Sequence, residues 1–311
     1  MAMGAHTSPH RPVLYQEIIN SLAPVSPKHY LDCTAGAGGH TQGILEACSP
    51  HGQVLALDLD PTAIQLAKKA TERFGKRVHI IHGSYLDAKE FVDDLGWTGV
   101  DGIVMDLGVS SMQLDQADRG FSFRQDAPLD MRFDPDQGES AADLLQSITE
   151  KELADLLWQY GEERFSRRIA KAIIKARPIQ TTSQLAQIVR ASIGRSSEKQ
   201  DPATRTFQAL RIAVNRELTT IAEALPLLIE LLHSGARIAV ISFHSLEDRL
   251  VKQAFKLAST DCICPPEQLV CTCGHKASVK LLRPHLILPD EAEQRENPRS
   301  RSAKLRVAEK L

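Results

Sequence analysis

The sequence predicts an α/β fold in which an open parallel sheet is interrupted by an all-helical insertion. Between residues 30 and 108, short β-branched or apolar runs alternate with amphipathic stretches, which is the pattern of consecutive βαβ units. Between about residues 110 and 205 the apolar positions recur at helical spacing, and no strand is evident. A fully apolar run at residues 236–243 then indicates that the sheet resumes.

Four strands are predicted in the alternating first part of the chain. They cover residues 29–35, 54–60, 78–83 and 100–107. Pro61 directly follows the second of them, and proline is favoured in the first turn of a helix. The order of patterns therefore predicts a parallel sheet with helices between its strands.

The middle of the chain carries helix signals instead. Thr149 and Glu152 form a capping-box pair. The apolar residues behind this pair share one helical face, at Leu153, Leu156, Leu157 and Tyr160. A long amphipathic stretch at residues 206–233 is ended by Gly235. We therefore expect a discontinuous α/β domain at residues 1–109 and 206–311, with an inserted helical domain at residues 110–205.

Charge and hydropathy restrict the partners and the location. The 37 basic and 39 acidic residues nearly cancel, so net charge gives no sign of a nucleic-acid partner, although a local basic patch would still bind one. No apolar run reaches the ~20 residues needed to span a bilayer, and the N-terminal residues do not form a secretory signal. We expect a cytoplasmic protein without a membrane partner.

Chemistry is expected at the carboxyl ends of the predicted strands, because ligands of open α/β sheets bind there. The first strand is followed by a turn containing Gly36, Gly38 and Gly39, which lets a ligand approach the backbone at the start of a helix. The turn lacks the Lys-Ser/Thr pair of a phosphate loop, and Thr41 stands where a dinucleotide-binding fingerprint has its third glycine. An ordinary glycine turn without a ligand is the alternative interpretation.

Acidic residues and one tyrosine stand at the ends of the other predicted strands. Asp58 lies about 20 residues after the glycines, where a carboxylate typically binds both hydroxyls of a ribose, whereas Asp60 also suits a helix N-cap. Tyr85 follows the third strand and either covers an adenine face or is a half-buried surface residue. Asp106 lies at the end of the fourth strand and either accepts hydrogens from a reacting or ammonium group or caps a helix.

Several longer motifs make the sequence similar to a known family. They are HRPVL at 10–14, GGHT at 38–41, DLGVSS at 106–111 continuing through QLD at 113–115, RGFSF at 119–123, PLDMR at 128–132, YGEER at 160–164, ATRTFQ at 203–208, SFHSLEDR at 242–249 and RSRSAKLR at 299–306. With these motifs the chain resembles, from residue 10 to residue 311, the bacterial MraW-type family of small-subunit ribosomal RNA cytosine-N4 methyltransferases.

The resemblance implies a class I S-adenosylmethionine methyltransferase with a Rossmann-like sheet and an inserted helical domain for substrate recognition. It implies transfer of a methyl group to N4 of a specific cytidine in the decoding region of 16S ribosomal RNA. The implied partner is ribosomal RNA or the small ribosomal subunit, and the chain is expected to be a monomer or a homodimer. Cofactor contacts are implied at Gly38, Gly39, His40, Asp58, Tyr85, Asp106 and Gln113.

The residues themselves favour a nitrogen acceptor. Methylation of carbon 5 of a pyrimidine needs a nucleophilic cysteine, and none ends the fourth strand. Asp106 is the candidate catalytic residue, because a carboxylate that accepts amino hydrogens makes the nitrogen more nucleophilic. Many amino-group methyltransferases carry an Asn/Asp-Pro-Pro-aromatic turn here, whereas this chain has Asp-Leu-Gly, so the acceptor atom follows from the resemblance alone.

Three segments are candidates for binding RNA. Phe121 and Phe123 alternate with polar and basic residues and either stack on a base or belong to a core. Phe243 and His244 follow the resumed strand, where a histidine either touches substrate or serves as a structural hydrogen-bond partner. The C-terminal basic run at 295–306, with Arg299 and Arg301 as candidate contacts, either grips phosphates or is a solvated face.

Four clustered cysteines are candidates for a structural zinc site. They form two Cys-x-Cys pairs, at Cys262 and Cys264 and at Cys271 and Cys273, with His275 as a substitute ligand. The one-residue spacing is tighter than usual, and free thiols or a disulfide are the alternatives.

Two other functions are also compatible with these residues. A methyltransferase for DNA or protein would share the same cofactor site, and a non-catalytic RNA-binding assembly factor would bind RNA without the cofactor. The missing third glycine argues against an oxidoreductase that uses a nicotinamide cofactor.

Overall fold

The computed structural model describes residues 12–194, 201–268 and 270–311 and divides the chain into two compact units. The α/β unit comprises Met1–Gly108 and Thr220–Leu311, and the helical unit comprises Val109–Thr219. The second boundary lies beyond α10 (Ala203–Val214), whereas the sequence analysis placed it between residues 205 and 206, inside that helix. Each unit has an apolar core of its own.

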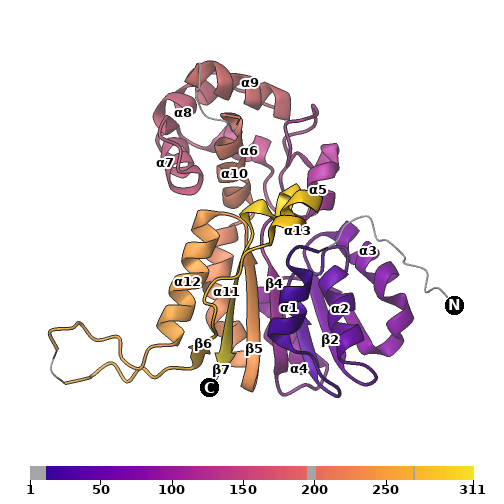
Figure 1. Cartoon of the computed structure of the whole chain (residues 1–311). Coiled ribbons are helices and arrows are strands. Elements are labelled where there is room, and N and C mark those ends of the chain that lie inside the picture. The colour runs from indigo at the N-terminus through magenta and orange to yellow at the C-terminus, as the bar shows by residue number, and fades with distance from the viewer. Residues whose placement is uncertain (1–11, 195–200, 269) are drawn as a thin grey trace. The chain divides into compact units, whose positions relative to one another are not determined.

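Within the described residues, the α/β unit forms a seven-stranded sheet with the order β3-β2-β1-β4-β5-β7-β6 (Figure 1). The parallel strands are β1 (His29–Asp32), β2 (Gln53–Asp58), β3 (Val78–His82), β4 (Val100–Asp106) and β5 (Leu232–Ser242). These strands confirm the predicted parallel sheet. β7 (Lys304–Lys310) and β6 (Val279–Leu281) extend it with antiparallel pairing that the sequence analysis does not predict.

Helices cover both faces of this sheet (Figure 1). One face packs on α1 (Tyr15–Leu22), α2 (Gly39–Ala47) and α3 (Pro61–Thr71), and the other on α4 (Ala88–Asp94), α11 (Glu217–Leu231) and α12 (Ser245–Ala258). Successive strand residues serve opposite cores, since Leu55 joins the core of α4, α11 and α12 while Val54 and Ala56 join the other. Burial of both faces explains why the strands read as unbroken apolar runs.

Short elements complete the α/β unit. They are η1 (Glu72–Arg77), η2 (Tyr85–Asp87), α13 (Glu291–Glu296) and η4 (Pro298–Ser302). In the described parts of the chain, none of the helices combines the length and apolar character required to cross a bilayer.

The helical unit consists of α5 (Ser111–Asp115), η3 (Ala117–Arg119), α6 (Ala141–Ser147), α7 (Glu150–Gly161), α8 (Ser166–Lys175), α9 (Thr182–Ile193) and α10. The predicted capping box is confirmed, because Thr149 accepts a hydrogen bond from the Glu152 amide and the Glu152 side chain accepts one from the Thr149 amide. The predicted apolar face of α7 is buried at Leu153 and Leu157. The fold prediction of a helical insertion between β4 and β5 is confirmed.

The amphipathic stretch predicted at residues 206–233 is two helices. α10 ends at Val214 and α11 begins at Glu217, with Arg216 between them at a left-handed φ of 51°. Asn215 stabilises this break, because its Oδ1 accepts from the Phe133 amide at 2.7 Å and its Nδ2 donates to the Met131 carbonyl at 2.7 Å. These partners lie far away in the sequence, so the helical pattern alone does not reveal the break.

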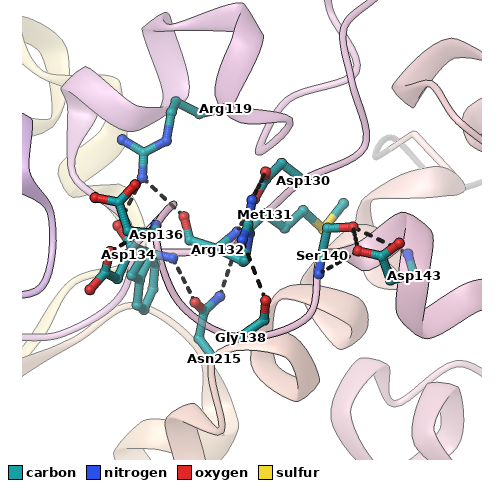
Figure 2. Close-up of polar contacts among 11 residues, drawn as sticks. Arg119, Asp130, Met131, Arg132, Asp134, Asp136, Gly138, Ser140, Asp143 and Asn215 are labelled. Carbon is teal, nitrogen blue, oxygen red and sulfur yellow. Dashed lines mark hydrogen bonds and ion pairs between the residues drawn. The ribbon is translucent and has the colours of Figure 1, made fainter.

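A polar network fixes the irregular segment between η3 and α6 (Figure 2). The Arg119 guanidinium donates to the carbonyls of Arg132 and Phe133 at 3.0 and 2.9 Å. The Arg132 guanidinium in turn pairs with Asp130, with an Nη2–Oδ2 distance of 2.7 Å. The motif residues RGFSF and PLDMR therefore contact one another and hold this loop in one conformation.

Candidate active site

Three carboxylates stand at the ends of neighbouring parallel strands. Asp32 ends β1, Asp58 ends β2 and Asp106 ends β4, and β1 pairs with both of the other strands. Since adjacent strands of a sheet lie about 4.8 Å apart, the three side chains share one edge. This is the edge at which open α/β sheets bind their ligands.

Asp58 reaches across to the glycine turn that follows β1. Its Oδ2 accepts from the Gly36 amide at 2.8 Å, and its Oδ1 accepts from the Asp60 amide at 2.9 Å. Burial raises the pKa of Asp58 to about 6, so the side chain is ionised at neutral pH. Asp60 instead accepts from the Thr62 amide at 2.9 Å and caps α3. Asp60 therefore has the N-cap role that the sequence suggested for it.

The glycines of the turn are required by packing. Gly38 has a φ of 86°, and a Cβ there would lie 3.2 Å from the Ala67 Cα. A Cβ on Gly39 would lie only 2.3 Å from Cγ of Pro12. As the N-cap of α2, Gly38 supplies no side-chain hydrogen bond, and this leaves the first amides of the helix to a polar ligand group.

A hydrogen-bonded set centred on Asp32 joins the strand ends. Asp32 is fully buried and accepts from the Thr41 hydroxyl at 2.6 Å and from the Thr34 amide at 3.1 Å. The Thr34 hydroxyl accepts from the Asp106 amide at 2.7 Å. Burial raises the pKa of Asp32. Asp32 was not among the site residues predicted from the sequence. The signal that could have identified it is an acidic residue at the end of an apolar strand.

His40 and Asp106 form the most polar part of this edge. His40 is 5% exposed, and its Nε2 lies 3.6 Å from Oδ2 of Asp106. Burial lowers the pKa of His40, but Asp106 and Asp32 outweigh it, so the pKa is raised. Among the described residues, the buried Oδ1 of Asp106 and both ring nitrogens of His40 have no hydrogen-bond partner. These atoms fit a ligand that carries both positive charge and hydrogen-bonding groups.

Tyr85 opens η2 immediately after β3. Ser84 caps this element by accepting from the Leu86 amide at 3.1 Å, and the partly buried Tyr85 ring packs against the core shared with α4. The tyrosine therefore has a packing role, and its predicted contact with an adenine ring stays a prediction.

His244 is the N-cap of α12 and is engaged by Glu247. The His244 Nδ1 accepts from the Glu247 amide at 3.4 Å, and its Nε2 lies 3.1 Å from Oε1 of Glu247. The fully buried Glu247 also accepts from the amides of Phe243 and His244. These contacts agree with the structural alternative for His244. The spacing of His244 and Glu247 was the sequence signal for this capping box, and Glu247 was missed.

The remaining predicted site residues of the helical unit are held by local packing. Gln113 is 5% exposed and completes a capping box, since its Oε1 accepts from the Ser110 amide at 2.9 Å. Phe121 is 8% exposed and stacks on Phe133, with 5.7 Å between ring centroids. Phe123 meets the ring of Phe207 edge-on at 4.8 Å. These positions agree with the core interpretation of the two predicted phenylalanines.

The C-terminal basic run is partly neutralised. Lys304 and Arg306 belong to β7 and pair with Asp248 at 3.3 and 2.7 Å. Although burial opposes it, this pairing holds the pKa of Asp248 below its usual value. Arg299 and Arg301 lie in η4, with Arg301 exposed and Arg299 partly buried.

The two Cys-x-Cys pairs come together in the segment between α12 and β6. Cys262, Cys264, Cys271 and Cys273 are free thiols whose sulfur atoms all lie within 4.8 Å of one another. His275 is not part of this group, because its Nε2 is hydrogen-bonded to the Leu257 carbonyl at 3.0 Å.

The chain also matches known proteins over nearly all of its length. A model of the MraW methylase family matches residues 7–311. The ribosomal RNA small subunit methyltransferase H of Dehalococcoides mccartyi is 48% identical over 303 residues, covering 97% of this chain and 87% of that protein. The proteins of the same name from Thermomicrobium roseum and Citrifermentans bemidjiense are 49% and 50% identical, covering 97% of this chain and 94% and 98% of theirs. The match confirms the resemblance seen in the motifs: the chain belongs to the MraW methylase family.

Proposed function

We propose that the protein is an S-adenosylmethionine-dependent methyltransferase that modifies N4 of a specific cytidine in 16S ribosomal RNA, within the small subunit. Family membership and the names of the relatives support the reaction and the RNA. The observation that carries the proposal is the group of polar side chains at the strand ends, Asp58, His40 and Asp106. Among the described residues, buried polar atoms of His40 and Asp106 have no hydrogen-bond partner.

The residues of this edge fit the cofactor that we propose. Asp58 has one lone pair left on each oxygen after accepting the Gly36 and Asp60 amides, which suits the two hydroxyls of a ribose. The free Oδ1 of Asp106 suits an ammonium group or the acceptor amino group. S-adenosylmethionine supplies an electrophilic methyl group on a sulfonium centre. Gly38, Gly39 and Tyr85 complete the proposed cofactor contacts of the α/β unit, and the contact implied for Gln113 stays a prediction.

Asp106 is the group that we propose to act on the acceptor. The lone pair of a cytosine amino group is delocalised into the ring, so accepting one of its hydrogens makes the nitrogen a better nucleophile. The raised pKa of His40 favours the charged imidazolium, whose Nε2 lies 3.6 Å from Oδ2 of Asp106. The main task left to the protein is alignment of the nitrogen with the methyl group and exclusion of water.

We propose that the helical unit recognises the substrate and that Arg299 and Arg301 contact phosphates. Both arginines belong to the α/β unit, and the exposed side chain of Arg301 is available to an anionic partner. Phe243 and His244 would then act by shaping the end of β5 rather than by stacking on a base, since Glu247 engages both of their amides.

Labelled methyl transfer tests the proposal directly. The full chain is incubated with S-adenosylmethionine and, in separate reactions, immature small ribosomal subunits, free 16S RNA, DNA and ribosomal protein. The expected result is incorporation into the small subunit or its RNA, with N4-methylcytidine as the labelled nucleoside. Label in 5-methylcytidine, DNA or protein would contradict the assignment.

Calorimetry with the cofactor separates an enzyme from an RNA-binding assembly factor. Binding of S-adenosylmethionine is expected in the native chain and is expected to be lost in Asp58→Ala. RNA binding without any cofactor binding would support the assembly factor instead.

A further inference from the structure

The four sulfur atoms between α12 and β6 have the mutual spacing of a tetrahedral metal site. Four of the six sulfur–sulfur separations are 3.5 Å for Cys262–Cys271, 4.0 Å for Cys264–Cys271, 3.6 Å for Cys271–Cys273 and 3.9 Å for Cys262–Cys273. A zinc ion with four thiolates at about 2.3 Å places them about 3.8 Å apart, by tetrahedral geometry. The observed separations bracket this value.

The surrounding segment, residues 259–278, is here named the cysteine loop. It leaves α12 and returns beside it, because the Ser278 amide donates to the Ala258 carbonyl at 2.8 Å and the Ala277 amide donates to Asp261 at 3.2 Å. Figure 1 shows the loop extending beyond α12 and β6. Its base is therefore closed by hydrogen bonds, while most of its described residues are exposed.

The cysteine loop has little apolar burial with which to hold its shape. Two of its described apolar residues face solvent, with Ile263 50% exposed and Val270 72% exposed. A long loop whose described residues form no helix or strand and bury little apolar surface needs another source of order. A bound metal supplies it by cross-linking separate positions of the loop. The Ile263 amide points at the Cys273 sulfur from 3.5 Å, as expected for a backbone arranged around thiolates.

A pair of disulfides fits this arrangement less well. A disulfide brings two sulfurs to about 2.05 Å and separates them from other thiols, whereas here Cys271 has three sulfur neighbours at similar distances. All four sulfur atoms lie within 4.8 Å of one another and so form one group. This is the arrangement that a single central ion requires.

We propose that Cys262, Cys264, Cys271 and Cys273 bind one zinc ion that orders the cysteine loop. The site is structural, because four protein ligands leave no open position for water or substrate. It also lies away from the strand-end edge, since α12 begins there, after its N-cap His244, and its 14 residues carry the chain about 20 Å before the loop starts. The zinc proposal is independent of the proposed methyl transfer.

Metal analysis of the full, untagged chain tests the site. The protein is purified under reducing conditions, and its zinc content is measured by mass spectrometry of the metal. The expected content is about one zinc ion per chain. Exchange for Co²⁺ should give the strong near-ultraviolet charge-transfer bands and visible bands of a tetrahedral tetrathiolate site.

Cys262→Ser/Cys271→Ser, which removes two ligands, is expected to lose the zinc and the Co²⁺ bands and to be cut faster within the cysteine loop by protease. It should keep its affinity for S-adenosylmethionine. The matched control Cys48→Ala removes a buried thiol outside the cluster and should keep the zinc.

Three results would overturn the proposal. The first is a native chain that carries no zinc and shows no Co²⁺ charge-transfer band. The second is an intact mass lowered by the hydrogens lost in disulfides. The third is zinc retained by the double variant. Because the Co²⁺ spectrum is measured on the native chain, the test does not depend on folding of the variants.

Discussion

At the scale of single residues, Asp58 is held by two backbone amides and yet has a raised pKa. Since burial raises that pKa above its ordinary value of 3.8 to about 6, the fold favours the protonated form. The contribution of Asp58 to stability therefore decreases as the pH rises from about 4 to about 6. A ligand that needs the carboxylate has the opposite dependence and binds best above this range.

The first prediction concerns the pH dependence of cofactor affinity. Below about pH 6, the affinity of the native chain for S-adenosylmethionine should fall about tenfold per pH unit, because a proton competes for Asp58. Calorimetry between pH 5 and pH 8 measures it. Asp58→Asn should bind weakly with a flat profile over the same range. Native affinity that stays constant through pH 6 would exclude Asp58 as the ligand.

The second prediction separates chemistry from binding at Asp106. Asp106→Asn should lower kcat about 100-fold, because an amide accepts hydrogen from the acceptor nitrogen less well than a carboxylate. Single-turnover rates at saturating cofactor measure this loss. The control Asp101→Asn changes the same strand at its other end, where Asp101 pairs with Lys28, and should leave kcat unchanged. Equal losses in the two variants would point to a structural effect.

At the scale of elements, Gly120 shows why the fold requires a glycine in the RGFSF motif at 119–123. It has a φ of 71°, and a Cβ there would lie 2.5 Å from the Pro128 carbonyl oxygen and 2.7 Å from the Asp130 amide. The glycine thus permits the close approach of the two motifs that the Arg119 and Arg132 contacts then fix (Figure 2). The segment is ordered by tertiary contacts, because it contains no helix or strand.

The third prediction follows from this close approach. Gly120→Ala should destabilise the protein by about 3 kcal/mol, through the left-handed backbone and the clash with two backbone atoms. Urea unfolding followed by far-ultraviolet circular dichroism measures the change. Gly138→Ala is the matched control, since Gly138 has a φ of 76° but no atom within 4 Å of its Cβ position, and it should cost about 1 kcal/mol. A similar loss of unfolding free energy in both variants would show that the backbone around residue 120 shifts to accommodate the added Cβ.

At the scale of the whole molecule, an overall charge of −2 has to be reconciled with an RNA substrate. Much of the basic C-terminal run is used internally, since Lys304 and Arg306 neutralise Asp248. RNA affinity must therefore come from a few local cations rather than from the net field. Arg299 and Arg301, which lie in η4 before β7, are the candidates for phosphate contacts.

The fourth prediction concerns the salt dependence of RNA binding. Arg299→Ala/Arg301→Ala should weaken RNA binding and reduce the slope of log K against log salt by about 1.4, because each of the two phosphate contacts contributes about 0.7. Titration of labelled RNA at several salt concentrations measures the slope. Lys68→Ala/Lys69→Ala removes the same charge from exposed positions on α3 and should leave the slope unchanged. Matching slopes in the two variants would assign the arginines to a solvated face.

Local sequence patterns were enough to predict the parallel strands, the helical insertion and the aspartates at the strand ends. Each depends on a local pattern, such as the apolar run before Asp58, because burial and helix periodicity act over a few neighbouring residues. Only the tertiary structure reveals the antiparallel strand β7, the Thr34–Asp106 hydrogen bond and the break between α10 and α11 that Asn215 stabilises. These features join residues that are distant along the chain, and a local pattern carries no information about which distant segment completes a hydrogen bond or a cluster.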